Sequence, residues 1–409
     1  MDAAWNERLK REMDFEAART APPEGFPDLP PLPSARYADE AFFELEREHL
    51  WKKSWVMAAH VADLPEPGSA VRFDHLGPPI AVVRGKDDVV RAFYNACQHR
   101  GAPVVRDASE CAQRLVCKYH GWTYDLDGRL VGVPDERDFG TLDRERLGLV
   151  PVRCETYAGL VFVNLDPIAA PLLDSLGAFA DEFAQFETEQ LRLVDRHHFM
   201  LDCNWKAAIE ANLEVYHLKL IHPYTVNQLL DHERTTIGLL PGGHSRMVSA
   251  KRDPNNDAGL SAAGLPRIAS VSEIAAITNL SYTVFPNLVT PTDIGGFPLL
   301  QFWPVDVRTT RFDVTWLVAD WSEGEAESDL PEHWKGFIGI FDTVLGEDTA
   351  NLDWIQRSME SPGCDSVPLS YQERRIYWLH EEVDRRIGEE RVPPELRVPP
   401  RLGDWAERV

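Results

Sequence analysis

Residues 95–101 read NACQHRG and residues 117–124 read CKYHGWTY, and these two stretches decide the fold prediction. The first places Cys97 two residues before His99, and the second places Cys117 three residues before His120. Thiolates and neutral imidazoles are common protein ligands of transition metals. A glycine follows each pair and would let the backbone come close to a bound group. The two stretches therefore predict one metal centre shared by two loops.

The donor set favours a Rieske [2Fe–2S] cluster on Cys97, His99, Cys117 and His120. Such a cluster takes two cysteines on one iron and two histidines on the other. A zinc site with two cysteines and two histidines is the alternative, and a chance grouping of core residues is another. Zinc sites usually draw a paired C-x-x-C knuckle from one loop, whereas each loop here mixes Cys with His.

These loops closely resemble the cluster loops of Rieske non-haem iron oxygenase α subunits, the aromatic-ring-hydroxylating mono- and dioxygenases. The resemblance extends from about Leu50 to Asp166 and includes Trp55 and Arg84. It implies an α+β chain: an N-terminal all-β Rieske domain, then a helix-grip (START-like) catalytic domain built on an antiparallel sheet. It also implies two cofactors, the [2Fe–2S] cluster and a mononuclear Fe(II).

A second metal pattern lies in residues 204–223, NWKAAIEANLEVYHLKLIHP. Helical spacing predicts one helix over Asn204–Ile221, with Glu210, Glu214 and His217 on one face. Pro223 disfavours helical geometry at His222, so the helix is expected to end there and let His222 turn towards His217. Two histidines and one carboxylate suit a non-haem Fe(II) site, so a carboxylate must come from elsewhere.

Asp348 is the expected third ligand. It shares an apolar stripe with Phe337 and Phe341 on a helix predicted over Trp334–Ser358, and a buried acid needs a partner such as a metal. Asp348 also matches the carboxylate ligand of the family. Glu347 is the alternative, although it is expected to point away from that stripe.

Length, composition and charge set the broad limits. The chain has 409 residues, 44% hydrophobic, with 42 basic and 66 acidic side chains and a net charge of −24. This charge argues against general affinity for nucleic acid or anionic lipid. Met1–Arg19 lacks the features of a signal peptide and no stretch is long and apolar enough for a membrane span, so we expect a cytoplasmic protein. The cysteines outside the metal pattern are expected to be free thiols: Cys111, Cys154, Cys203 and Cys364.

Changes in the pattern of predicted strands, helices and turns along the chain predict three parts. Residues 1–50 form an arm and a helix, residues 51–167 the Rieske domain, and residues 168–409 the catalytic domain. The Rieske part carries hairpin signals at Gly85–Asp88 and Asp127–Gly128. The catalytic part alternates helices with strand-like runs, and Gly242–Gly264 and Ser322–Asp329 are predicted to be loops.

The family resemblance also implies partners. Electrons come from NAD(P)H through a reductase, possibly with a ferredoxin, and similar subunits form head-to-tail trimers. There Glu214 would bridge His217 to His120 of the partner subunit, acting as the catalytic link between the two centres. Most members carry Asp at this position, and some that act on quaternary ammonium substrates carry Glu.

The expected activity is oxygenation of a small organic substrate, aromatic or quaternary ammonium, by hydroxylation, dihydroxylation or oxidative demethylation. Pocket candidates are apolar and aromatic residues: Leu213, Phe285, Trp303, Trp316 and Phe341. A non-catalytic Rieske electron carrier and a ligand-binding paralogue without iron are the alternatives. The second metal pattern argues against both.

Overall fold

The structure is a computed structural model that describes residues 1–107, 112–320 and 330–407. The chain forms two compact units, Trp51–Ser175 and a larger unit of Met1–Leu50 with Leu176–Val409. The N-terminal arm thus folds as part of the larger unit. In the described ranges, the search for a helix long and apolar enough to cross a membrane found none.

The smaller unit is built on antiparallel β-sheets, as predicted. A six-stranded sheet has the order β2-β10-β9-β5-β4-β3, and a three-stranded sheet has the order β6-β7-β8. The strands are β2 (Val56–His60), β3 (Ala70–Phe73), β4 (Ile80–Arg84), β5 (Val90–Tyr94), β6 (Leu115–Val116), β7 (Thr123–Tyr124), β8 (Leu130–Gly132), β9 (Pro151–Tyr157) and β10 (Leu160–Asn164).

Both predicted hairpins of this unit are present. Arg84 pairs with Val90 across the first turn. At the second turn Gly128 has a φ of +88°, which glycine adopts without the steric cost that other residues pay. The core of this unit includes Cys97 and Cys117, so the two cysteine loops fold inward against the small sheet.

The larger unit is built on a seven-stranded antiparallel sheet of order β11-β17-β16-β15-β14-β13-β12. Its strands are β11 (Arg192–Leu201), β12 (Leu230–Leu239), β13 (Ser245–Lys251), β14 (Thr278–Val284), β15 (Leu288–Thr292), β16 (Gly296–Asp306) and β17 (Thr309–Val318). A short pair, β1 (Leu32–Pro33) with β18 (Ser366–Val367), ties the proline-rich arm to the C-terminal part. The sheet with its helices confirms the predicted fold class.

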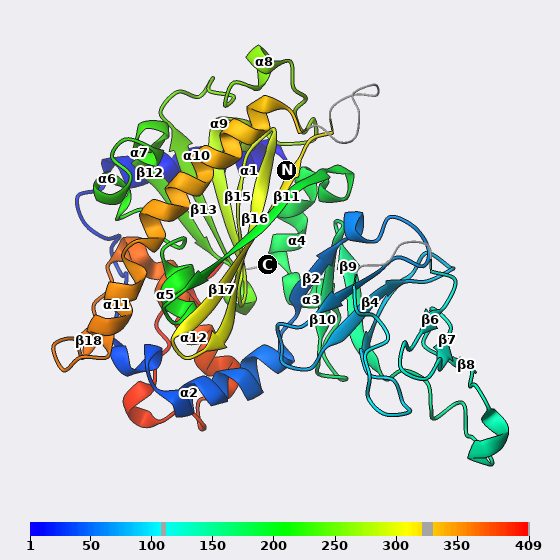
Figure 1. The fold of residues 1–409 in the computed structure, drawn as a ribbon. Helices are drawn as coiled ribbons and strands as arrows, with labels where there is room; N and C mark the ends of the chain where they lie inside the picture. Colours follow the sequence, from blue (N-terminus) through cyan, green and yellow to red (C-terminus); the bar gives the residue numbers. More distant parts are fainter. Residues whose placement is uncertain (108–111, 321–329, 408–409) are drawn as a thin grey trace. The chain divides into compact units, whose positions relative to one another are not determined.

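Helices cover this sheet, and Figure 1 shows the long α10 lying across one of its faces. The α-helices of the described residues are α1 (Ala3–Ala18), α2 (Glu40–Leu45), α3 (Leu172–Leu176), α4 (Ala178–Phe183), α5 (Trp205–Glu210), α6 (Leu218–Ile221), α7 (Val226–Leu229), α8 (Leu260–Ala263), α9 (Glu273–Ile277), α10 (Glu332–Thr349), α11 (Leu352–Met359) and α12 (Arg374–Ile387). The N-terminal α1 packs against β12 and β13.

Three predictions of local structure are wrong. The helix expected over Asn204–Ile221 is two short helices, α5 and α6, and the one expected over Trp334–Ser358 divides into α10 and α11. Residues 242–264, expected to be a loop, contain β13 and α8. The prediction for Ser322–Asp329 lies outside the described residues, as does Cys111.

Candidate metal centres and substrate cavity

The two cysteine loops of the smaller unit have the same backbone geometry. The Gly101 N–H donates to the Cys97 carbonyl at 2.8 Å, and the Gly121 N–H donates to the Cys117 carbonyl at 2.9 Å. Both glycines have positive φ values, +72° and +74°. The cysteines are buried, whereas His99 is half-buried and His120 is exposed. A group held by all four would present its histidine side to the surface.

The side chains at these loops fit a cluster that bridges them. The His99 and His120 rings lie 4.5 Å apart between centroids. The buried Nδ1 of His99 finds no hydrogen-bond partner in the described parts of the chain, and burial and the neighbouring His120 lower the pKa of this imidazole. A neutral, unpartnered imidazole nitrogen is what a metal ligand requires. The Tyr124 hydroxyl accepts the Gln98 N–H at 2.9 Å, so its proton is free for Cys97 Sγ, 3.2 Å away.

In the larger unit, Glu214 explains why the predicted single helix breaks. Helix α5 ends at Glu210, and α6 begins only after His217. The Glu214 carboxylate accepts the backbone N–H groups of Tyr216 and His217, so it caps the start of the next turn. Glu210 therefore does not share a helical face with Glu214 and His217. It points to a separate buried group, where Tyr37 donates to it at 2.9 Å.

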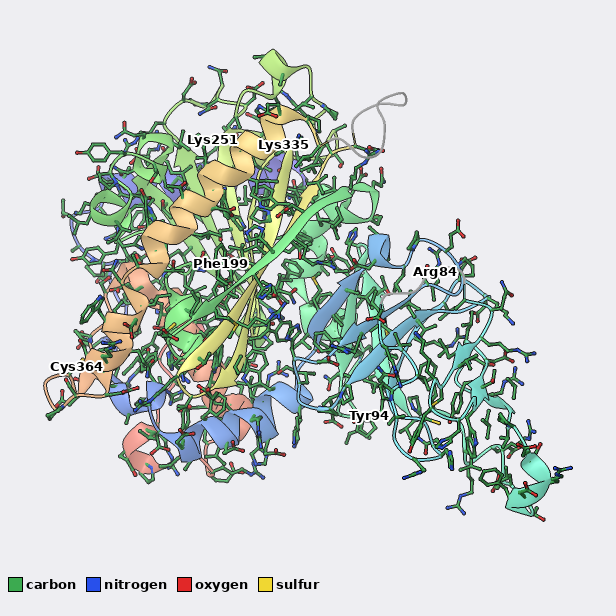
Figure 2. The ribbon with its side chains drawn as sticks, in the orientation of Figure 1. Arg84, Tyr94, Phe199, Lys251, Lys335 and Cys364 are labelled. Atoms are coloured by element: carbon green, nitrogen blue, oxygen red, sulfur yellow. The ribbon has the colours of Figure 1, made fainter. Side chains whose placement is uncertain are left out.

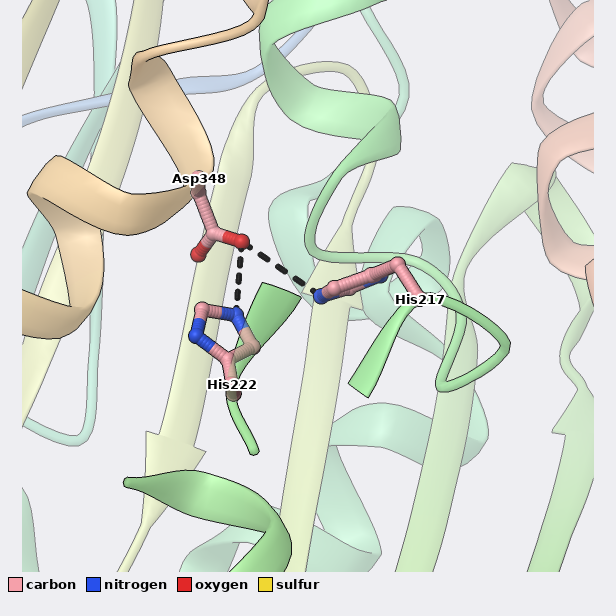
Figure 3. Close-up of side chains that lie close together, drawn as sticks. All are labelled: His217, His222 and Asp348. Atoms are coloured by element: carbon pink, nitrogen blue, oxygen red, sulfur yellow. Dashed lines mark hydrogen bonds and ion pairs between the residues drawn. The ribbon is translucent and has the colours of Figure 1, made fainter. Parts of the chain in front are cut away.

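The break brings His217, His222 and Asp348 together. One potential ligand atom from each of these residues lies within 4.8 Å of the others. Asp348 Oδ1 is 2.8 Å from His222 Nε2 and 3.4 Å from His217 Nε2, and the dashed lines in Figure 3 mark these two contacts. Asp348 stands in the last turn of α10, where the helix dipole is unfavourable for an acid. The two imidazoles, or a cation between them, offset this cost.

Each histidine is held on its far side by a glutamate. Glu214 pairs with His217 Nδ1, and Glu347 Oε2 lies 2.7 Å from His222 Nδ1. Thr225 donates its hydroxyl to the same Glu347 oxygen at 2.7 Å. Both Nε2 atoms are therefore directed towards Asp348. Glu347, the alternative ligand in the sequence, lies behind His222 rather than beside Asp348.

The charges around the histidines strongly perturb their titration. Burial lowers the pKa of His217, but the hydrogen bonds with Asp348 and Glu214 outweigh it and raise this pKa to about 10. Burial acts in the opposite sense on Asp348, yet the two histidines hold the pKa of its carboxyl below the ordinary value. A bound dication would take the place of the protons that Asp348 and the two glutamates favour on the imidazoles. Two imidazoles and one carboxylate, with room for further ligands, fit a mononuclear Fe(II).

The histidine pair opens onto a cavity of about 550 Å³. Asp348, His217 and His222 line it at one place, and the predicted residues Trp316 and Phe341 line its wall. Phe341 packs edge-on against Trp316, with 5.2 Å between ring centroids. The cavity is large enough for a small organic molecule.

The other predicted pocket residues, Leu213, Phe285 and Trp303, are not among the residues that line this cavity. Leu213 is buried in the turn that follows α5, where its N–H donates to the Glu210 carbonyl at 2.9 Å. Phe285 lies beyond the end of β14, beside the Arg386 guanidinium of α12. Trp303 is an odd number of residues from Pro298, a cavity residue on the same strand, so it faces the other side of the sheet.

Two protein families match separate parts of the chain, one for each metal centre. Residues 54–151 match the family described as the Rieske [2Fe-2S] domain, and residues 187–389 match the ring hydroxylating alpha subunit (catalytic domain). The chain belongs to the Rieske oxygenase α subunits. Membership implies the two cofactors whose fit is described above, a [2Fe–2S] Rieske cluster and a mononuclear iron. The predicted family, fold and cofactors are thereby confirmed.

Relatives of both predicted substrate types are similar to this chain. The carnitine monooxygenase oxygenase subunit of Escherichia coli (strain K12) is 36% identical over 194 residues, 47% of this chain and 52% of that protein. The 2-aminobenzenesulfonate 2,3-dioxygenase subunit alpha of Alcaligenes sp is 34% identical over 253 residues, 60% of this chain and 64% of that protein. The matched region thus spans between half and two thirds of these relatives.

Solved structures share the fold over a greater length. A quaternary ammonium Rieske monooxygenase in complex with L-carnitine has a TM-score of 0.73 at 24% identity, covering 90% of this chain and 99% of that chain. Naphthalene 1,2-dioxygenase from Rhodococcus sp. bound to indole has a TM-score of 0.71 at 22% identity, covering 96% and 100%. At this level of identity the likeness concerns the fold.

Proposed function

We propose that this protein is the oxygenase component of a multicomponent Rieske oxygenase, which uses O₂ and electrons from NAD(P)H to oxidise a small organic substrate. The observation that carries the proposal is the group His217, His222 and Asp348 at the wall of a 550 Å³ cavity. These three residues would hold the mononuclear iron. Cys97, His99, Cys117 and His120 would hold the cluster. The bound iron supplies the activation of O₂ that allows oxygen to enter an unreactive C–H bond or aromatic ring.

The chain's own residues orient the site and keep it apolar. Glu214 and Glu347 fix the two imidazoles with Nε2 towards Asp348, which is the usual role of carboxylates behind metal-ligating histidines. Val215, Leu218 and Met247 form an apolar cluster beside His217. These side chains restrict water beside the reacting carbon, which favours transfer of oxygen to substrate over unproductive release.

Electron delivery is proposed to involve a reductase, possibly a ferredoxin, and a homotrimer. The exposed His120 is available to a partner, and Glu214 stands beside His217 with its side chain 10% exposed. Glu214 Oε2 accepts two backbone N–H groups, whereas Oε1 contacts only His217 Nδ1 among the described residues, so Oε1 can also accept a hydrogen bond from His120 of the partner subunit. The free thiols of Cys154, Cys203 and Cys364 suit a reducing compartment, and we place the protein in the cytoplasm.

Two substrate classes remain for this site, quaternary ammonium compounds and aromatic compounds. The relatives act on carnitine, glycine betaine and 2-aminobenzenesulfonate. The aromatic wall of Trp316, Phe337 and Phe341 can contact either an ammonium group or a ring. An electron carrier without its own chemistry would need neither the cavity nor the second metal group.

The direct test is single-turnover oxygenation. Protein reduced without oxygen is mixed with ¹⁸O₂ and a candidate substrate, and the product mass is measured. We expect one or two ¹⁸O atoms in the product, or formaldehyde with ¹⁸O where a methyl group is removed. Asp348→Ala is the matched control, because it leaves the cluster loops unchanged. Product formation of equal yield in that variant would refute the proposed site.

A further inference from the structure

The floor of the cavity changes from apolar to polar side chains along β13. Met247, Ser249 and Lys251 alternate on this strand and all line the cavity (Figure 2 labels Lys251). On the neighbouring strand Ser281 pairs with Met247, and Asn279 pairs with Ser249. Side chains two residues apart on a strand are separated by about 7 Å. The floor is thus a series of rows about 7 Å apart.

The row that contains Met247 belongs to the iron end of the cavity. Met247 packs with Val215 and Leu218, which flank His217 in the chain. On the same face of the sheet, towards its opposite edge, Trp316 pairs with Pro298, and both line the cavity. This row is therefore mainly apolar and lies beside the proposed reacting position.

The two rows beyond it are polar: the first holds Ser249 with Asn279, and the second holds Lys251, whose ammonium group forms an ion pair. Lys251 Nζ lies 2.9 Å from Asp293 Oδ2, and it donates to the Asn256 carbonyl at 3.4 Å. The side chains of Lys251 and Asp293 are 8% and 19% exposed. Lys251 is the sole lysine or arginine among the described residues that line the cavity.

The ammonium group has a donor to spare. An ammonium group carries three N–H donors, and the described contacts of Lys251 account for two. Ser249 adds a second donor, since its oxygen accepts from the Thr235 hydroxyl at 3.0 Å and its own proton is free to face the cavity. Asn279 donates one amide hydrogen to the Thr292 carbonyl at 3.1 Å and keeps the other. Lys251, Ser249 and Asn279 therefore offer three donors on the part of the cavity floor beyond Met247.

We propose that Lys251, with Ser249 and Asn279, binds an acidic group of the substrate. The substrate class is then a small organic acid, a carboxylate or a sulfonate, whose oxidised carbon lies roughly 7–14 Å from the acid group, one to two rows along the floor. This inference rests on the proposed oxygenase function and adds the substrate's charge to it. The ion pair with Asp293 holds the Lys251 ammonium group in place at the far end of the cavity.

The competing explanation is that the Lys251–Asp293 ion pair only stabilises the fold. Substitution of Asp293 distinguishes this explanation from acid binding. If the pair only stabilises the fold, Lys251→Met and Asp293→Asn should have similar effects. If Lys251 binds an acid, Lys251→Met removes the binding group. Asp293→Asn instead frees a further donor and removes a negative charge beside the ligand, so acid binding should become tighter.

The experiment is calorimetric titration of the resting, unreduced holoenzyme, which cannot turn over. The probes are two acids with their uncharged-acid analogues: γ-butyrobetaine with its methyl ester, and 2-aminobenzenesulfonate with its sulfonamide. For at least one pair we expect the wild type to bind the acid at least tenfold more tightly than the analogue. Lys251→Met should abolish this preference with analogue affinity unchanged, Lys251→Arg should retain part of it, and Asp293→Asn should increase it.

The proposal is overturned if neither acid is preferred by the wild type, or if the preference survives in Lys251→Met. It is also overturned if Asp293→Asn loses the preference as Lys251→Met does. Retention of the cluster's visible spectrum and of cooperative unfolding shows that each variant is folded. Failure of the oxygenase function itself appears elsewhere, as absent mononuclear iron or absent ¹⁸O product, and the titration does not depend on turnover.

Discussion

Glu347→Gln should weaken the mononuclear iron site without changing its ligands. Glu347 accepts from His222 Nδ1 and from Thr225 Oγ1, both at 2.7 Å and both through Oε2. The amide has nearly the same shape and one acceptor oxygen, but no charge. The change thus isolates the charge that fixes the orientation of His222.

The size of the effect follows from these contacts. A hydrogen bond to a charged group contributes roughly 1.5–3 kcal/mol, against roughly 0.5–1.5 for a neutral one, so the loss is about 1–1.5 kcal/mol. The Glu347 side chain is 29% exposed, so water replaces part of the lost interaction. A loss of about 1.4 kcal/mol is a factor of ten, so we expect an iron affinity weaker by up to about tenfold. This value is at the low end of the usual effect of carboxylates behind metal-ligating histidines.

The assay is anaerobic titration of Fe(II) into protein from which the mononuclear iron has been removed, with the cluster's visible spectrum as a check that the other centre is intact. Glu332→Gln is the matched control, because it removes the same charge from α10 at a side chain that is 93% exposed. Thr225→Val should weaken iron binding less than Glu347→Gln. Equal iron affinity in Glu347→Gln and in the control would refute the reasoning.

Three further predictions concern other parts of the chain. Cys97→Ser should remove the visible absorption and the EPR signal of the reduced mixed N/S-ligated cluster, and a retained signal would contradict the cluster assignment. Glu214→Gln should keep both metal centres but slow oxidation of the reduced cluster in single-turnover stopped-flow measurements; an unchanged rate would make Glu214 an ordinary buried acid. Lys206 pairs with Glu46 at 2.6 Å and both side chains are fully buried, so Lys206→Met should lower the free energy of unfolding by about 3–5 kcal/mol. Adding Glu46→Gln should restore much of this loss in urea denaturation, and an unrestored double variant would contradict the explanation.

The cluster loops were predictable because their information is local. Cys97 and His99 stand on one turn, Cys117 and His120 on another, and the spacing within each turn fixes which atoms meet. The hairpin at Gly128 is local in the same sense. Such features need no knowledge of distant parts of the chain.

The break after Glu210 was not predictable from periodicity. The apolar spacing continues through residues 211–217, and only the Glu214 carboxylate, folded back on the N–H groups of Tyr216 and His217, shows that the helix stops. The role of Glu347 depends in turn on where His222 lies after that break. A helical wheel of α10 alone therefore cannot predict that Glu347 contacts His222.

The pocket residues depended on strand register, which a short apolar sequence leaves open. Trp303 and Trp316 look alike in sequence, yet the pleat turns one away from the cavity and the other towards it. Lys251 was missed because it lies within Gly242–Gly264, which was predicted to be a loop. Its signal was the alternation of Met247, Ser249 and Lys251, a period of two typical of a strand with one face on a cavity.

The central claim is that one chain holds two separate iron centres, and iron with acid-labile sulfide analysis tests it most directly. The wild type should contain about three irons and two sulfides per chain. Asp348→Ala should contain about two irons and two sulfides, because its cluster ligands lie in the other unit. Stoichiometric zinc without sulfide in the wild type, or three irons retained in Asp348→Ala, would contradict the account.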